Sequence, residues 1–190
     1  MIKQEHIQLW SKKWIQGHHL PTSRLVLRLP GIRDARQVFQ LVQDPQVTKY
    51  MSFESPSKVE HTKAHLSQRR VRCKKGESLE LVIVLQSTGK VIGSVGIMDI
   101  SLKDHKAEMG YWLGREYWGN GYMPEAVTAL AGFGCKNLGI EKLTIRVFDG
   151  NIASQRVAEK CGFVFEAMMK KDAFVKNKHW DVHYYAKLKK

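Results

Sequence analysis

The sequence predicts an α+β protein built on one mixed β-sheet of about seven strands with flanking helices. Two observations carry this prediction. Short apolar segments follow one another through the middle of the chain and are joined by tight turns, which is typical of antiparallel strands. After them, strand-like and helix-like segments alternate, which is typical of a parallel crossover. The chain of 190 residues is long enough for one domain with a substantial core.

The first strand and two helices are predicted in the N-terminal half. Residues 24–29, Arg-Leu-Val-Leu-Arg-Leu, alternate with period two, and residues 34–42 carry apolar side chains at helical spacing. Ser57 followed by Glu60 is a capping-box signature. This signature predicts a second helix that reaches about Arg70.

The remaining elements follow from apolar runs and from glycines that end them. In chain order we expect strands at 79–85 and 91–97, a strand at 108–113, a helix at 123–138, a strand at 143–148, a helix at 153–160 and a closing hairpin of 164–171 with 180–188.

Residues 1–21 are expected to form an N-terminal extension to a domain of residues 22–190. Within the extension, Ile7, Trp10 and Trp14 recur at helical spacing. They could pack on the domain or contact a partner, and we favour packing.

The chain is strongly basic, with 31 Lys and Arg residues against 18 Asp and Glu residues and a formal net charge of +13. This excess predicts attraction to polyanions such as nucleic acid, the ribosome, anionic lipid or a phosphorylated cofactor. A generally basic surface without such a partner explains it equally well. The densest patch lies just before Gly76, so we interpret it as a solvated loop. It consists of Arg69, Arg70, Arg72, Lys74 and Lys75.

Other classes of protein are disfavoured by what the chain lacks. No apolar run reaches the roughly 18 residues of a membrane span, so we expect no membrane association and a cytoplasmic location. The three cysteines have no metal-ligand spacing and indicate free thiols in a reducing compartment. His61 and His65 are one helical turn apart but have no evident third ligand, so we expect no metal site.

The sharpest local feature is a pair of glycines, Gly119 and Gly121, at a predicted strand-to-helix turn. Glycine allows positive φ and close backbone approach, and the start of the next helix favours a bound phosphate. A P-loop would need a Gly-Lys-Ser/Thr ending, which is absent. A dinucleotide fingerprint would need a third glycine where Pro124 stands. The pyrophosphate loop of acetyltransferases remains, although residues 118–123 match its pattern, Arg/Gln-x-x-Gly-x-Gly/Ala, only at the centre.

The surrounding residues resemble the GNAT superfamily of N-acetyltransferases. Residues 108–113 read Glu-Met-Gly-Tyr-Trp-Leu and residues 117–122 read Tyr-Trp-Gly-Asn-Gly-Tyr, which is similar to the central motif of that family. Residues 151–163 are similar to the family's Asn-x-x-Ser-x-x-Val-x-Glu-Lys-x-Gly-Phe. The resemblance covers about residues 22–188 and is strongest to ribosomal-protein N-terminal acetyltransferases of the RimJ/RimL type.

This resemblance implies an acyltransferase that transfers acetyl from acetyl-coenzyme A to a primary amine. It implies that Glu108 removes a proton from the acceptor through water and that Ser154 donates to the leaving thiolate. Their structural alternatives are a salt-bridged surface carboxylate and a hydroxyl that caps a helix. Asn151, whose implied role is to bind the cofactor's pantetheine arm, could equally be a helix N-cap. The implied cofactor contacts are Tyr111, Trp112, Leu113, Arg115, Gly119, Asn120, Gly121, Tyr122, Met123, Asn151 and Ser154.

The acceptor amine is constrained by its protonation. A protein α-amine has a pKa of about 7.7–8.0 and a lysine about 10.4, so an α-amine acceptor requires a weaker base. We expect the acceptor to be a protein N-terminus, plausibly that of a ribosomal protein, and the sequence is compatible with ribosome association and with a homodimer. A small amine such as a polyamine or aminoglycoside, a non-catalytic acyl-coenzyme A sensor and an RNA-binding module are the alternatives.

Overall fold

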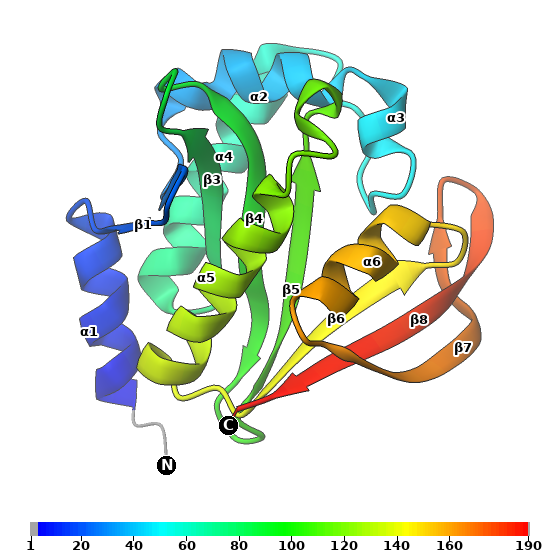
Figure 1. Cartoon of the computed structure of the whole chain (residues 1–190). Helices are drawn as coiled ribbons and strands as arrows, with labels where there is room; N and C mark the ends of the chain where they lie inside the picture. Colours follow the sequence, from blue (N-terminus) through cyan, green and yellow to red (C-terminus); the bar gives the residue numbers. More distant parts are fainter. Residues whose placement is uncertain (1–3, 190) are drawn as a thin grey trace.

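The structure, a computed structural model, describes residues 4–189, with side chains from Trp10 onward. It is one open eight-stranded sheet with helices on both faces (Figure 1). The strands are β1 (His19–Pro21), β2 (Leu25–Arg28), β3 (Leu79–Leu85), β4 (Val91–Ser101), β5 (Lys106–Leu113), β6 (Lys142–Phe148), β7 (Val164–Val175) and β8 (Lys178–Leu188). The helices are α1 (Gln4–Ile15), η1 (Ile32–Asp34), α2 (Ala35–Val42), α3 (Pro45–Thr48), α4 (Val59–Lys75), η2 (Arg115–Tyr117), α5 (Tyr122–Asn137) and α6 (Ile152–Lys160).

The strand order is β1-β2-β3-β4-β5-β6-β8-β7. Strands β1 to β5 pair antiparallel, β5 and β6 pair parallel, and the closing strands are antiparallel again. The predicted mixed α+β sheet is therefore confirmed, with one strand more than expected. The extra strand, β1, comes from residues predicted to belong to the N-terminal extension, and it pairs with β2.

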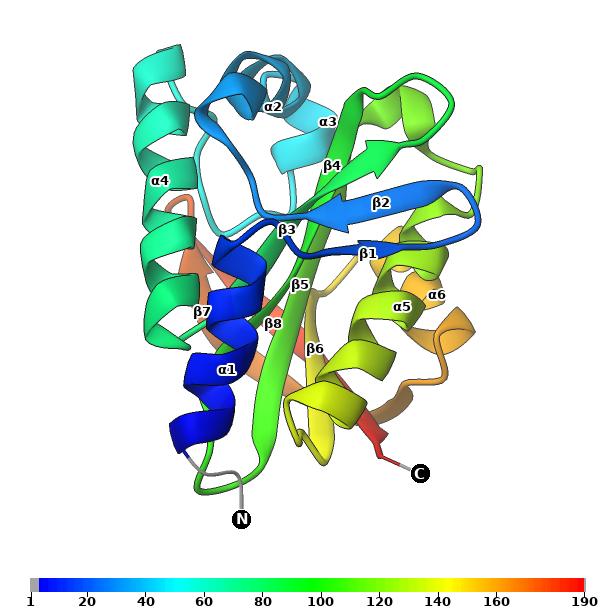
Figure 2. The ribbon, with the colours of Figure 1, turned by 90° about the vertical axis from the view of Figure 1, so that its left-hand side faces the viewer.

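Alternation along the central strands sends side chains to two faces of the sheet. Ile97 and Met109 belong to the larger core cluster, beneath α5 and α6. Val82 and Trp112 belong to a second cluster, beneath α2 and α4. Figure 2 shows these two helix layers on opposite sides of the sheet.

Helix α1 packs on this core. Trp10 is 6% exposed and Trp14 is 1% exposed. The Trp14 ring meets Phe133 of α5 edge-on, with 5.5 Å between ring centroids. The prediction that these tryptophans pack on the domain is confirmed for both, whereas the side chain of Ile7 lies outside the described residues.

Helix α4 differs from its sequence prediction at both ends. Its N-cap is Lys58, without a side-chain cap, and Ser57 Oγ instead lies 3.4 Å from His61 Nδ1. The helix also continues to Lys75, so the basic patch is helical and the prediction of a loop there was wrong. The reason is tertiary: Arg69 is buried and pairs with Glu80 of β3, a partner that the local sequence cannot indicate.

Among residues 4–189, no helix is both long and apolar enough to cross a membrane.

Candidate active site

The sheet opens between β5 and β6. These parallel strands pair only over residues 106–108 and 142–144, and beyond that point they diverge (Figure 1). Helices α5 and α6 lie on one face beside the opening, and Glu108 stands at its apex. Since Glu108 alternates with Met109, its side chain points to the opposite face from these helices. The opening therefore has helix N-termini on one side and a carboxylate on the other.

The turn before α5 presents free backbone N–H groups. Gly119 and Gly121 have φ of +79° and +75°, the left-handed conformation that favours glycine. Within the described part of the chain, no atom accepts a hydrogen bond from the backbone N–H groups of residues 119–123. A side chain built on Gly119 would meet no atom within 4 Å, so the backbone there is open to a ligand. This arrangement at the start of a 16-residue helix fits the pyrophosphate of a coenzyme A thioester.

Side chains of the turn hold its shape. Asn120 Nδ2 donates to the carbonyl oxygens of Tyr117 at 3.3 Å and Trp118 at 3.0 Å. Trp118 Nε1 donates to the carbonyl oxygen of Leu113 at 2.7 Å. These bonds engage the Asn120 side chain and leave the backbone N–H groups of the turn free.

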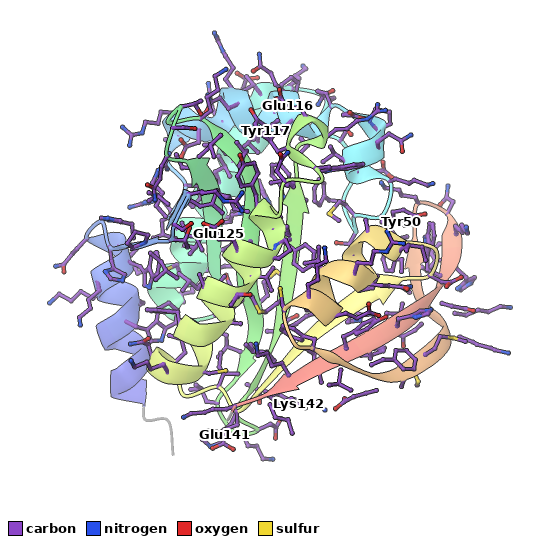
Figure 3. The ribbon with its side chains drawn as sticks, in the orientation of Figure 1. Tyr50, Glu116, Tyr117, Glu125, Glu141 and Lys142 are labelled. Atoms are coloured by element: carbon purple, nitrogen blue, oxygen red, sulfur yellow. The ribbon has the colours of Figure 1, made fainter. Side chains whose placement is uncertain are left out.

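Arg24 braces the same turn from the other end of the sequence. Its Nε donates to Glu125 Oε2 at 2.8 Å, and its Nη1 donates to the Asn120 carbonyl oxygen at 2.9 Å. Its guanidinium also lies over the Tyr122 ring, 4.6 Å from the centroid. Figure 3 shows Glu125 pointing from α5 toward β1 and β2. Sequence reasoning assigned Arg24 no role, because Glu125 stands 101 residues later and no local pattern joins them.

The Glu108 carboxylate is partly buried and has no hydrogen bond or ion pair to any described residue. Burial raises its pKa above the ordinary value, and the negative charge of Asp99 adds to this, while the positive charge of Arg146 opposes it. Arg146 is itself held by Asp172, with Nη2 3.0 Å from Oδ2. The salt-bridged surface carboxylate considered from the sequence is thus not what the structure contains. A partly buried, unbonded carboxylate can accept a proton.

Ser154 lies in the first turn of α6. Asn151 is the N-cap of that helix, and its side chain accepts from the Ser154 N–H at 3.3 Å. The Ser154 hydroxyl therefore does not cap the helix, and it lies 3.0 Å from the Tyr111 hydroxyl. Burial strongly raises the pKa of Tyr111, which keeps its hydroxyl protonated. The structure joins Tyr111 of β5 to Ser154 of α6 across the opening between the strands.

The other residues predicted to contact the cofactor do not all face the opening between β5 and β6. The Trp112 side chain is buried against α2 and α4, so it faces away from Tyr111. Leu113 is a core residue of the other cluster, and Met123 is buried with it. Arg115 is exposed and forms a long ion pair of 3.9 Å with Asp44. In the part of the chain that the structure describes, no group of His, Cys, Asp or Glu is placed to hold a metal.

An aromatic cluster spans the outer end of the opening. Trp180 of β8 stacks on Phe148 of β6, with ring centroids 5.3 Å apart, and meets Tyr50 edge-on at 5.7 Å. The Tyr50 hydroxyl donates to the Gly150 carbonyl oxygen at 3.0 Å, near the start of α6 (Figure 3). The segment after α3 is thereby tied to the diverging strand β6.

Comparison with known proteins identifies the family of the chain. The sequence pattern of the acetyltransferase (GNAT) domain matches residues 24–164. The uncharacterized N-acetyltransferase p20 of Bacillus licheniformis is 30% identical over 171 residues, which cover 90% of this chain and 96% of p20.

Two ribosomal-protein acetyltransferases are also similar. The ribosomal-protein-serine acetyltransferase of Escherichia coli is 28% identical over 99 residues, 52% of this chain and 55% of that protein. The crystal structure of RimL, a ribosomal L7/L12 α-N-protein acetyltransferase in complex with coenzyme A, superposes with a TM-score of 0.82 at 24% identity, covering 90% of this chain and 98% of RimL. The family expected from the sequence motifs is confirmed. The chain belongs to the GNAT acetyltransferases and is an N-acetyltransferase whose acetyl donor is acetyl-coenzyme A.

Proposed function

We propose that this enzyme acetylates the N-terminal α-amine of a protein, foremost a ribosomal protein. The observation that carries the proposal is the single unbonded carboxylate of Glu108 at the apex of the strand opening. An α-amine with a pKa of about 7.7–8.0 is already partly neutral at pH 7, whereas only a few in ten thousand lysine amines are neutral there. A carboxylate whose pKa is raised by burial is a sufficient base for the first and a poor one for the second.

Acetyl-coenzyme A supplies the activated acetyl group when it is bound. Glu108 accepts a proton from the ammonium form of the acceptor through a water molecule, so that the nitrogen lone pair can attack the thioester carbonyl carbon. The N–C bond then forms as the C–S bond breaks, and the second proton that the acetylated nitrogen loses ends on the departing sulfur, which leaves as the thiol of coenzyme A. We assign the pyrophosphate to the backbone N–H groups of residues 119–123 and the carbonyl oxygen to the backbone of β5 near Tyr111.

Ser154 donates a hydrogen bond to the sulfur as the thiolate departs. Because Tyr111 can donate its own proton to Ser154 Oγ, the proton of Ser154 is free to point at the sulfur. A hydroxyl with a high pKa stabilises the thiolate by hydrogen bonding and does not itself remain deprotonated. Arg146 opposes the rise in the pKa of Glu108, and Asp172 holds Arg146 in place by an ion pair, so both act as positioning residues for Glu108.

The charge around Glu108 supports an amine acceptor. Asp99 acts on Glu108, and Asp172 holds Arg146, so three carboxylates interact here with one guanidinium, in a chain whose net charge is +13. An acidic neighbourhood attracts a cationic amine. The relatives that act on ribosomal proteins favour a protein N-terminus over a small amine.

The test is mass spectrometry of a peptide library incubated with isotope-labelled acetyl-coenzyme A. The library contains ribosomal-protein N-terminal sequences beside peptides with internal lysine only and beside polyamines. We expect label on α-amines, reduced by roughly 100-fold in Glu108→Gln. Glu141→Gln is the matched control, because Glu141 is an exposed carboxylate at the far end of the sheet (Figure 3).

Label confined to polyamines or other small amines would overturn the protein acceptor and leave the acetyltransferase intact. If Glu108→Gln still labels α-amines at the natural rate, the α-amine acceptor stands and Glu108 is not the base. No label on any amine, despite measured binding of acetyl-coenzyme A, would indicate a sensor.

A further inference from the structure

A cationic surface lies at the β1–β2 edge of the sheet, at the end of the strand order opposite to β7. Two neighbouring hollows of about 580 and 520 Å³ share Arg28 and Arg33 in their walls. Arg70 and the histidine pair His18 and His19 line the first, and Arg36 lines the second. Figure 2 views this side, with β1 and β2 framed by α1, α2 and α4. Neither GNAT chemistry nor the site described above uses this surface.

The charges of this surface are unbalanced. Asp34 is the one carboxylate among the residues that line the two hollows, and it is already neutralised. Its oxygens accept from Arg28 at 2.7 Å each and from the Gly31 N–H at 2.7 Å. The side chains of Arg33 and Arg36 are exposed, and neither forms a hydrogen bond or ion pair with a side chain described between residues 10 and 189. The charge of Arg33 does act on Asp34, where it helps to lower the pKa of that carboxyl.

The third unbalanced arginine comes from α4. Arg70 makes only a 3.4 Å contact to the Pro30 carbonyl oxygen. Burial, and then the charges of His19 and Lys13, lower the pKa of His18, so its imidazole adds no positive charge to this surface near neutral pH. Arg33 lines both hollows, Arg70 the first and Arg36 the second, so guanidinium groups from three elements present paired N–H donors to phosphate oxygens along this surface.

We propose that this surface, defined as Arg33, Arg36 and Arg70 around the two hollows, binds the phosphate backbone of structured RNA. The surface is concave and Ile32 is its one exposed large apolar side chain, so it does not fit a flat membrane. Among the described lining residues the exposed rings are the imidazoles of His18 and His19, and the His18 ring already meets the Trp14 ring edge-on, with 4.8 Å between centroids. No exposed Phe, Tyr or Trp lines either hollow to give an unpaired base a large stacking platform. Arginines without stacking partners fit the backbone of a duplex, which is read through phosphates and shape. The inference does not depend on which amine is acetylated.

The test is fluorescence anisotropy of a labelled RNA hairpin with a stem of about 16 base pairs, titrated with the intact protein at several salt concentrations. The variant Arg33→Gln, Arg36→Gln, Arg70→Gln removes three charges from the surface. We expect its affinity to fall roughly tenfold or more, and the slope of log Kobs against log salt to flatten by about 3. Thermal unfolding and acetyl-coenzyme A turnover should remain as in the natural protein.

The matched control removes the same charge elsewhere. Lys103, Lys160 and Lys170 are exposed and do not line the hollows, and their side chains form no hydrogen bond or ion pair with a described residue. Their triple Gln variant should keep the RNA affinity within about threefold and change the slope little. An equal loss in both variants would mean a diffuse basic surface and would overturn the proposal. So would the absence of RNA binding at low salt, or displacement of the RNA by polyglutamate of equal charge at the same concentration.

Discussion

The hydroxyl group of Tyr111 lies 3.0 Å from Ser154 Oγ and 3.1 Å from the Ser154 carbonyl oxygen. Tyr111 has one proton for these two acceptors, and only the bond to Oγ leaves the proton of Ser154 free for another partner. The pair links β5 to α6, the helix that follows β6, across the opening between the two strands. It therefore places Tyr111 as a positioning residue for the Ser154 hydroxyl.

Tyr111→Phe should lower kcat about fivefold, the effect of one net hydrogen bond of about 1 kcal/mol, with little change in KM for acetyl-coenzyme A. Steady-state kinetics of Tyr111→Phe, Ser154→Ala and the double variant will measure the coupling. We expect the double variant to be no slower than Ser154→Ala alone, because Tyr111 acts through Ser154. Losses that simply add would show that Tyr111 acts on its own.

The pH dependence of kcat should report the Glu108 carboxyl. Glu108 works as a base only when deprotonated, so kcat should be lost as pH falls through its pKa, which burial raises above 4.5. Arg146 lowers that pKa, so Arg146→Met should move the acid limb of the profile to higher pH. Arg146→Lys keeps the positive charge and serves as the control. If the acid limb stays in place in Arg146→Met, the group that titrates there is not Glu108.

Arg24 should govern affinity for acetyl-coenzyme A more than turnover. Arg24→Met removes the bonds to Glu125 and to the Asn120 carbonyl oxygen, which releases the turn whose N–H groups face the ligand. We expect Kd for acetyl-coenzyme A to rise roughly threefold to tenfold, measured by isothermal titration, with kcat at saturation nearly unchanged. Arg36→Met is the control, since Arg36 is exposed and its side chain forms no hydrogen bond to the turn or to any other described side chain. Equal effects of the two substitutions would argue for general electrostatic attraction instead of a braced turn.

Local patterns were sufficient for the motifs but not for the contacts that position them. The glycine turn at Gly119 and Gly121, the strand that carries Glu108 and the helix that carries Ser154 each lie in one short stretch of sequence, and each could be predicted. The Arg24–Glu125 bond joins residues 101 positions apart, and only the folded sheet brings them together. Such a pair has no signature in a single sequence.

In helix α4, local patterns predicted features that the folded chain does not contain. Ser57 and Glu60 satisfy the capping-box pattern, yet the Ser57 hydroxyl lies near His61 and the helix begins later. The basic residues that seemed to belong to a loop are held in the helix by burial of Arg69 against β3 and β4. A charge-rich segment is solvated by default, and the exception depends on a partner from another element.

The buried ion pair of Arg69 with Glu80 should contribute strongly to stability. Arg69 is 6% exposed, and its Nε lies 3.2 Å from Glu80 Oε2 while its Nη1 donates to Ser94 Oγ at 2.8 Å. Removing one member of a buried pair leaves the other charge short of a partner, so Arg69→Met should lower the free energy of unfolding by about 3–5 kcal/mol in urea titrations. Arg72 also contacts Glu80, which places the expected loss toward the lower end.

The neighbouring substitution Arg70→Met is the control, because Arg70 has no carboxylate partner among the described residues, and it should cost no more than about 0.5 kcal/mol. The double variant Arg69→Met, Glu80→Leu should recover part of the loss, since it removes both buried charges and fills the space with apolar groups. Arg69→Met and Arg70→Met variants of equal stability would mean that the ion pair contributes no more than a surface contact. In that case the length of α4 would have to be explained by its packing on β3 alone.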